Sequence, residues 1–250
     1  MASGHLSRLP YRSRLFARYL NDYYVSRSLR GNRFECPVCG GRFDTFLPYG
    51  NPLRPNARCP RCGAFERHRL LWLYLRARTE IFSSRTSLLD VAPVWYIQRK
   101  LRALKNLDYL SIDLSSIVAM RHMDLTHLDL PSDHFDSIMC FHVLEHIPDD
   151  RMAMSELYRV LRPGGWALIQ VPVYKGLKET VEGPDVRDPS ERIRRFGHPD
   201  HVRKYGQDYT QRLGQAGFEV LEDRWAQSLS EQGARLFGVN RWEVFYRCSK

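Results

Sequence analysis

The sequence lacks any long hydrophobic run. Its longest apolar stretches, residues 137–144 and 166–173, are far below the roughly 18 residues that span a bilayer. Arginines interrupt the chain from Arg8 to Arg18, so the apolar core of a signal peptide is missing as well. We therefore expect a cytoplasmic protein without a membrane partner. The 250 residues, 43% apolar and 26% charged, predict a globular chain with one large domain, alone or with a smaller one.

Lysine is absent from the first 84 residues. This segment holds fifteen arginines and five acidic residues, a formal charge of +10, whereas the 23 basic and 23 acidic residues of 85–250 cancel. The asymmetry predicts a basic domain at residues 1–84 and an electrically balanced domain at residues 85–250. The arginines are consistent with a solvated face or with a surface for an anionic partner.

Cysteine is scarce, but four of the six cysteines form two C-P-x-C-G motifs. Each C-x-x-C turn directs two thiolates toward one point, and the glycine after the second cysteine permits a tight turn. Two such turns complete a tetrahedral site with no open position, so we expect structural rather than catalytic Zn²⁺ in a small zinc-ribbon-like module. The predicted ligands are Cys36, Cys39, Cys59 and Cys62.

The spacing of apolar residues predicts two helices flanking the cysteines, at residues 6–29 and 66–82. From residue 87 onward, short apolar runs alternate with helical stretches, as in α/β proteins. The fold class is therefore α/β, a doubly wound, mostly parallel seven-stranded sheet whose last two strands form a hairpin-like pair. Such sheets bind ligands beyond the carboxyl ends of their strands, here between the first and fourth. Strands are expected at residues 88–92, 109–113, 120–124, 135–141, 167–172, 218–223 and 242–248, and helices at 94–104, 149–161 and 207–216.

Acidic residues lie at the ends of three consecutive predicted strands, at Asp90, Asp113 and Asp124. The carboxyl ends of parallel strands share one edge of the sheet, so the three acids arrive together. An acid after the second strand can accept hydrogen bonds from ribose hydroxyls, and one after the third can accept from the adenine amine. The pattern predicts a nucleoside-binding edge.

Three further motifs occur in a fixed order along the second domain. They are F-D-S-I at residues 135–138, H-V-L-E-H-I at residues 142–147 and E-L-Y-R-V-L-R-P-G-G at residues 156–165. With these motifs, residues 86–250 resemble the class I S-adenosylmethionine-dependent methyltransferases, type 11-like, which have a Rossmann-like fold. The resemblance is specific for fold and cofactor and carries little information on the substrate.

The resemblance implies a bound S-adenosylmethionine. Asp113 would hold the ribose, Asp124 and Leu125 would border the adenine, and Phe141 with His142 would lie beside the methionyl end. The full set of expected cofactor residues is Asp90, Ala92, Pro93, Asp113, Leu114, Asp124, Leu125, Phe141 and His142.

The glycines that this family usually has after the first strand are missing. Where D-x-G-x-G is typical, the chain has Asp90-Val91-Ala92-Pro93-Val94. Alanine is the smallest substitute for the first glycine, but proline has a fixed φ and no N–H to donate. We expect the loop to take another path. Such a loop resembles that of bacterial methyltransferase-like proteins with an N-terminal C-P-x-C-G pair, and the alternative is an inactive cofactor-binding protein.

The segment 173–205, after the fifth strand, is predicted to be a substrate lid. His198 and His201 are candidate general bases, since neutral imidazole titrates near working pH. Alternatively, together with Asp200 they bind a divalent metal, or they only hydrogen-bond within the lid. The candidate catalytic residues are His201, His198, His142 and Tyr205.

The leading functional hypothesis is an enzyme that transfers a methyl group from S-adenosylmethionine to oxygen or nitrogen, less readily to carbon or sulfur, of a small molecule or short peptide. In this hypothesis the zinc module caps the site. The alternatives are an RNA methyltransferase whose basic zinc module binds phosphate, and an inactive S-adenosylmethionine-binding protein. No Asn-Pro-Pro-Tyr segment follows the fourth strand, which argues against adenine in DNA as the substrate.

Overall fold

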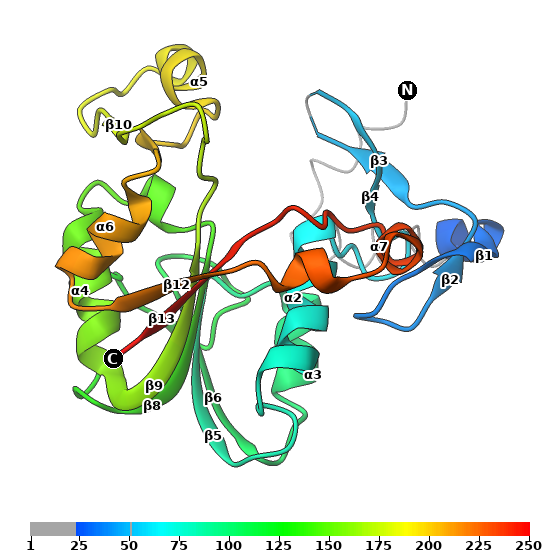
Figure 1. The fold of residues 1–250 in the computed structure, drawn as a ribbon, viewed down its shortest axis with the longest axis horizontal. Helices are drawn as coiled ribbons and strands as arrows, with labels where there is room; N and C mark the ends of the chain where they lie inside the picture. The colour runs from blue at the N-terminus through cyan, green and yellow to red at the C-terminus, as the bar shows by residue number, and fades with distance from the viewer. Residues whose placement is uncertain (1–23, 51) are drawn as a thin grey trace. The chain divides into compact units, whose positions relative to one another are not determined.

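The computed structural model describes residues 24–50 and 52–250, so most of the predicted helix at residues 6–29 lies outside the described residues. The chain forms two compact units (Figure 1). The cysteine unit comprises Met1–Thr79 and Ala226–Glu243, and the sheet unit comprises Glu80–Trp225 and Val244–Lys250. The sequence pattern places a boundary near residue 84, which is close to the observed division. It gives no indication that residues 226–243 join the cysteine unit.

The sheet unit contains the expected seven-stranded sheet. Its order is β12-β13-β9-β8-β5-β6-β7, with β13 antiparallel to both of its neighbours and the other neighbouring strands parallel. The order reverses at β5 and β8, the first and fourth strands, as the sequence pattern predicts. The strands are β5 Thr86–Val91, β6 Leu107–Asp113, β7 Arg121–His122, β8 Phe135–Phe141, β9 Leu161–Gln170, β12 Glu219–Asp223 and β13 Phe245–Ser249.

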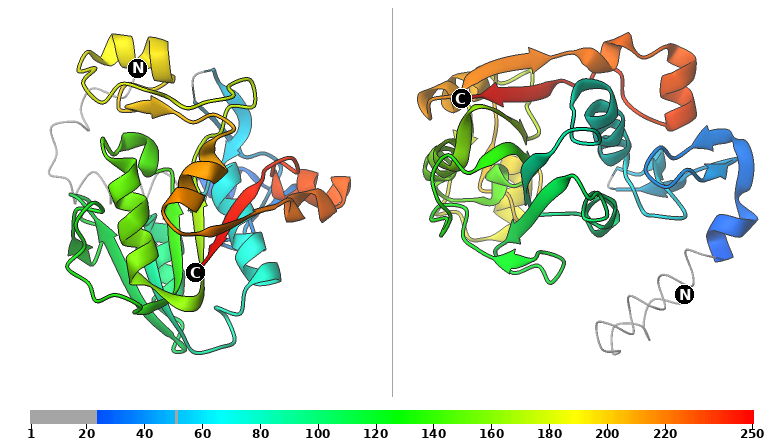
Figure 2. Two further views of the ribbon diagram at one scale, coloured as in Figure 1. Left: turned by 60° about the vertical axis from the view of Figure 1, so that its left-hand side comes forward. Right: turned by 90° about the horizontal axis from the view of Figure 1, so that it is seen from below.

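Helices cover both faces of this sheet (Figure 2). On one face lie α4, Asp150–Val160, and α6, Tyr209–Gln215, whose apolar side chains share a core with the central strands. On the other lies α3, Trp95–Leu101, which buries Ile97 and Leu101. Asp149 begins α4 by accepting a hydrogen bond from Met152 N at 2.9 Å, a side-chain cap that satisfies an otherwise unpaired donor.

The predicted lid folds as a small structure of its own. In it, β10, Val181–Glu182, pairs with β11, Arg203–Lys204, and between them lies α5, Pro189–Phe196. Val202 N donates to the backbone oxygen of Glu145 at 2.9 Å, next to the short 3-10 helix η2, Leu144–His146. The lid is therefore tied to the loop that follows β8.

In its described residues the cysteine unit contains two β-hairpins, a helical segment at residues 24–28 and two further helices. The hairpins are formed by β1, Arg30–Glu35, with β2, Arg42–Phe43, and by β3, Leu47–Tyr49, with β4, Arg54–Arg58. The two further helices are α2, Glu66–Arg78, and α7, Glu231–Phe237, and a 3-10 helix η3, Trp225–Ser228, begins the C-terminal segment.

Arg69 joins these pieces from the centre of the cysteine unit. Its side chain is fully buried, and its guanidinium donates to five backbone carbonyls at 2.7–3.2 Å. Three of these carbonyls belong to the region around β4 and the second cysteine turn, and two lie at the C-terminal end of α7. The guanidinium also lies 4.3 Å from the centre of the Phe46 ring. The acceptors are the oxygens of Asn56, Ala57, Ala64, Phe237 and Gly238.

Within the part of the chain that the structure describes, no helix combines the length and apolar character needed to cross a membrane.

Candidate functional site

A cavity of about 590 Å³ lies in the sheet unit, beyond the carboxyl ends of β5, β6 and β8. Residues that end or follow these strands line it, among them Ala92, Asp113 and His142. The lining also includes Asp124 and Leu125 from the loop after β7. The cavity therefore occupies the switch point of the sheet, where doubly wound folds bind ligands.

Two residues of the cavity wall have a backbone conformation that normally favours glycine. Ala92 has φ 53° and His142 has φ 56°, immediately after the neighbouring strands β5 and β8. Their N–H groups donate to the oxygens of Ile112 and Gln170, each at 2.8 Å. The sequence predicts, mainly from Pro93, that this loop takes a path other than that of the glycine-containing loop; Ala92 itself adopts the left-handed conformation that glycine favours. Such strain in non-glycine residues, about 1–3 kcal/mol each, is typical of ligand sites.

The two acids predicted to contact the nucleoside are fixed by their own loops. Asp113 Oδ1 accepts from the N–H groups of Ser115 and Ser116 at 2.8 and 2.7 Å. Asp124 Oδ1 accepts from the N–H and hydroxyl of Thr126, both at 2.8 Å, and these bonds lower the pKa of Asp124. In the described structure Oδ2 of each carboxylate has no protein hydrogen bond, so this oxygen is available to accept from a ligand.

Asp90 differs from the other two acids. It is 6% exposed, lies outside the cavity lining and accepts a hydrogen bond from Tyr109 Oη at 2.5 Å. Burial raises the pKa of Asp90 to about 7, against the opposing effect of the Tyr109 hydrogen bond. Its position supports a role beneath the site rather than contact with a ligand.

Six of the nine expected cofactor residues line the cavity, namely Ala92, Asp113, Leu114, Asp124, Leu125 and His142. The other three do not line it: Asp90, the buried Pro93 and the half-buried Phe141. Pro93 precedes the N-cap Val94 instead of occupying the first position of α3. His146 of the H-V-L-E-H-I motif, a further candidate from the sequence with either a scaffold or a cofactor role, also lines the cavity.

Four histidines and one glutamate gather at the cavity edge; we call them the histidine cluster. Its members are His142, Glu145, His146, His198 and His201. The His201 ring centre lies 4.7 Å from those of both His146 and His198. Of the three, His146 lines the cavity and the other two do not. Burial lowers the pKa of His201 to about 4, so its imidazole is neutral at pH 7.

Tyr205 lies apart from the histidine cluster, in the protein core. It is 1% exposed, its hydroxyl donates to Asp150 Oδ2 at 2.6 Å, and burial raises its pKa. Arg203 and Arg212 also pair with Asp150, at 3.5 and 2.8 Å. The catalytic role expected for Tyr205 is therefore corrected to a supporting one, because its polar atom is committed to a buried ionic network.

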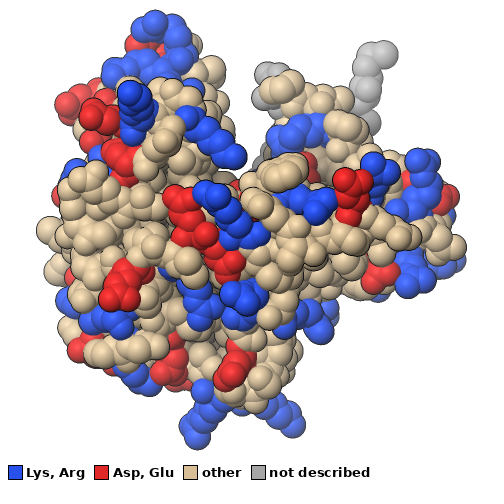
Figure 3. All heavy atoms as spheres, viewed as in Figure 1, with Lys and Arg blue, Asp and Glu red and all other residues tan. Residues whose placement is uncertain are grey.

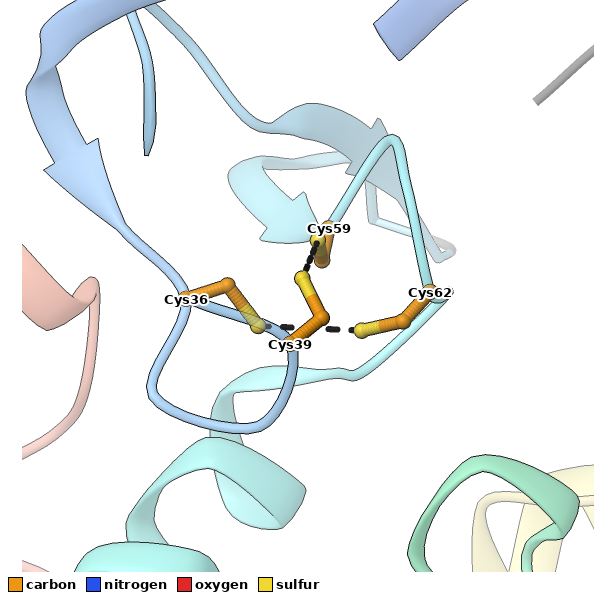
Figure 4. Close-up of side chains that lie close together, drawn as sticks. All are labelled: Cys36, Cys39, Cys59 and Cys62. Carbon is orange, nitrogen blue, oxygen red and sulfur yellow. Dashed lines mark hydrogen bonds between the residues drawn. The ribbon is translucent and has the colours of Figure 1, made fainter. Parts of the chain in front are cut away.

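The four cysteines of the C-P-x-C-G motifs converge in the cysteine unit (Figure 4). Cys36 Sγ lies 3.6 Å from Cys62 Sγ, and Cys39 Sγ lies 3.8 Å from Cys59 Sγ. These separations are too long for disulfides, whose sulfurs are about 2.05 Å apart. A tetrahedral ZnS₄ centre with Zn–S bonds of about 2.3 Å has sulfurs about 3.8 Å apart, so the sulfur positions fit zinc.

The two cysteine turns have the same backbone geometry. The glycine after each second cysteine, Gly40 or Gly63, has a positive φ of 67° or 81°. Each glycine N–H donates to the oxygen of the first cysteine of its motif, at 2.8 and 2.9 Å. The sequence prediction that these glycines permit tight turns is confirmed.

The strand order and the switch-point cavity of the sheet unit fit a Rossmann-like methyltransferase fold. Residues 85–169 match the family model described as "Methyltransferase domain". A protein of Mycolicibacterium smegmatis (strain ATCC 700084 / mc(2)155) named "Probable S-adenosylmethionine-dependent methyltransferase" is 35% identical over 104 residues. The match covers 41% of this chain and 36% of that protein, so the chain spans about a third of its relative. Both findings are similarities to methyltransferases, and they agree with that part of the resemblance.

The comparison with solved structures finds matches at low sequence identity. The cyclase SpnF superposes with a TM-score of 0.50 at 17% identity, and the match covers 96% of this chain and 95% of SpnF. An S-adenosylmethionine-dependent methyltransferase from Mesorhizobium loti has a TM-score of 0.45 at 16% identity, with 72% and 97% covered. Similarity at this level concerns the fold alone, since one fold supports different chemistries.

Proposed function

We propose that the protein transfers a methyl group from S-adenosylmethionine to an oxygen or nitrogen of a small molecule or short peptide. The observation that carries this proposal is the cavity at the switch point, where Asp113 and Asp124 each present an unpaired carboxylate oxygen. In this proposal Asp113 accepts hydrogen bonds from the ribose hydroxyls, and Asp124 accepts one from the adenine amine. Leu125 lies beside the adenine ring. The left-handed residues Ala92 and His142 then border the methionyl end.

Methyl transfer from a sulfonium requires alignment and, for a protonated acceptor, a base. S-adenosylmethionine, when bound, supplies the methyl group. The chain must place the acceptor in line with it and exclude water. His142 is on the cavity wall, and its Nδ1 lies 3.3 Å from Glu145 Oε1. This contact orients the ring, and His142 is the proposed proton acceptor, with His198 and His201 at the acceptor side.

Calorimetric titration with S-adenosylmethionine tests the cofactor site. Asp113→Ala removes hydrogen bonds to a charged acceptor, each of which contributes about 1.5–3 kcal/mol, so affinity should fall at least tenfold. Asp108→Ala is the matched control, because Asp108 is an exposed residue of the same strand outside the cavity. Equal affinity of the two variants would remove Asp113 from the site.

For the cysteine unit we propose structural Zn²⁺ bound by Cys36, Cys39, Cys59 and Cys62. The sulfur separations and the two matching turns support this assignment. Four thiolates leave no coordination position for a substrate, so the metal stabilises the unit and takes no part in methyl transfer.

RNA is a second candidate substrate, favoured by the surface of the cysteine unit. Nine of its arginines between residues 24 and 79 are exposed, and Figure 3 shows basic side chains over this unit with few acidic ones. An open groove of about 710 Å³ in the same unit is lined by Arg33, Arg235 and Trp242, whose side chain is 68% exposed. Arginines can bind phosphate and an exposed indole can stack on a base. RNA affinity that falls steeply with salt and weakens in Trp242→Ala would favour this candidate over a small acceptor.

A further inference from the structure

Glu145 is a buried carboxylate without a strongly bound cationic side chain. It is 2% exposed, and among the residues that the structure describes Oε1 contacts only His142, at 3.3 Å. Its other oxygen, Oε2, is buried and has no hydrogen-bond partner in residues 24–50 and 52–250. Arg203, which packs nearby, directs its guanidinium to other acceptors, including Asp150. A carboxylate removed from water in this way is strongly unfavourable unless another cation balances it.

One imidazole beside Glu145, that of His146, is oriented as metal ligands usually are. His146 Nδ1 lies 3.2 Å from the backbone oxygen of Asp200. A carbonyl can only accept, so Nδ1 carries the hydrogen and Nε2 keeps its lone pair. The His201 ring lies beside it, with its centre 4.7 Å from that of His146. A ring nitrogen bonded to a carbonyl fixes the tautomer of a metal-binding histidine.

The three side chains converge on one point. One ligand atom each from Glu145, His146 and His201 lies within 4.8 Å of the other two. A divalent cation bound at about 2.0–2.2 Å in a tetrahedral site brings its ligand atoms to about 3.3 Å from one another, so closure needs side-chain movements of about 1 Å. His146 is also part of the cavity wall, which places the convergence point beside the cavity.

We propose that Glu145, His146 and His201 bind a divalent transition-metal ion such as Zn²⁺, and that this ion holds a hydroxyl acceptor for methylation. Two imidazoles and one carboxylate suit Zn²⁺, Mn²⁺ or Fe²⁺ and leave coordination positions open. The site is separate from the four cysteines, whose coordination would be complete. The proposal that these residues bind a cation depends only on their geometry. The proposal that the cation holds the methyl acceptor also depends on the proposed methyl transfer.

The chemistry at such a site is balanced without a further reactant. Coordination lowers the pKa of the acceptor hydroxyl, whose proton passes to His142 on the cavity wall and then to solvent. The acceptor oxygen forms a bond to the methyl carbon as the carbon–sulfur bond breaks. The electron pair of that bond stays on sulfur, so the sulfonium becomes a neutral thioether and one proton is released.

Zinc stoichiometry tests the cation site. The full-length protein and its variants are equilibrated with Zn²⁺, freed of excess ion and analysed for metal per chain. Glu145→Gln, which keeps the side-chain volume, and His201→Ala should each bind one zinc fewer than the wild type. The controls His134→Ala and Glu222→Gln, exposed residues outside the histidine cluster, should equal the wild type. The difference does not depend on whether the cysteines also bind zinc, and no difference would overturn the proposal.

A second measurement tests the acceptor role. Mn²⁺ bound at this site should enhance the relaxation of the S-methyl protons of added S-adenosylmethionine in the wild type and not in Glu145→Gln. If S-adenosylmethionine does not bind, the proposed function fails while the zinc result still decides the cation site. If it binds with the same relaxation in both proteins, the metal does not lie beside the methyl group and the acceptor role is refuted.

Discussion

Replacing Arg69 should unfold the cysteine unit. Arg69→Met keeps an unbranched apolar chain but removes all five hydrogen bonds and leaves five buried or partly buried carbonyls without this donor. An unsatisfied buried acceptor costs about 1–3 kcal/mol, and breaking a buried charged network costs about 3–5 kcal/mol. Since these contributions are not additive, we expect a loss of about 4 kcal/mol or more, comparable with the 5–15 kcal/mol that stabilises a typical domain.

The charge of Arg69 connects this prediction to the cysteines. Burial lowers the pKa of Arg69, and the thiolates of Cys36, Cys59 and Cys62 are among the groups that oppose this effect. Four thiolates with one Zn²⁺ carry a net charge of −2, which offsets the buried guanidinium. Arg69→Lys should restore little stability, because a single ammonium has three donors and cannot reach five carbonyls.

The assay is urea titration with two signals, zinc release for the cysteine unit and far-UV circular dichroism for the whole chain. Two signals are needed because a chain with two units need not unfold in one step. Arg67→Met, an exposed position on the same helix, is the control and should shift the midpoint of zinc release little. If Arg69→Met releases zinc at the same urea concentration as Arg67→Met, the reasoning from its hydrogen bonds is refuted.

Three further outcomes follow from groups described above. The folded-state pKa of Asp90 is raised to about 7, so between pH 4 and 7 the native state holds more protons than the unfolded state. The contribution of Asp90 to the free energy of unfolding therefore falls as the pH rises through this range. Asp90→Asn should therefore raise the melting temperature at pH 8 more than at pH 4, and equal shifts would contradict the raised pKa. Ala92→Val, a β-branched residue at φ 53°, should destabilise the sheet unit by about 1–3 kcal/mol, whereas Ala92→Gly should be neutral or slightly stabilising; thermal melting of both variants decides. Removing zinc with a chelator, or replacing Cys59 with Ser, should abolish protease resistance of the cysteine unit, and an unchanged digestion pattern would argue against a structural metal.

The sheet could be predicted because each central strand is a short apolar run bounded by polar residues. The start of β9 was misplaced because Arg162-Pro163-Gly164-Gly165 is typical of a turn, yet the structure extends the strand through it from Leu161. Asp113 and Asp124 were found because strand ends share one edge of a parallel sheet. The convergence of Glu145 with His201 could not be derived, since 55 residues separate them and the path of the lid depends on tertiary contacts such as those of Arg203.

The placement of residues 226–243 has a consequence for how the chain acquires its structure. This segment supplies α7 to the cysteine unit, and the chain then returns to the sheet unit as β13, which separates β9 from β12. Neither unit is therefore complete until the ribosome has passed residue 243, although domains usually fold one after another from the N-terminus. Three chain crossings join the units, after residues 79, 225 and 243, so cutting the chain near residue 84 separates the cysteine unit from its own helix. To isolate the sheet unit, residues 226–243 must be removed as well, and a short linker must join Trp225 to Val244.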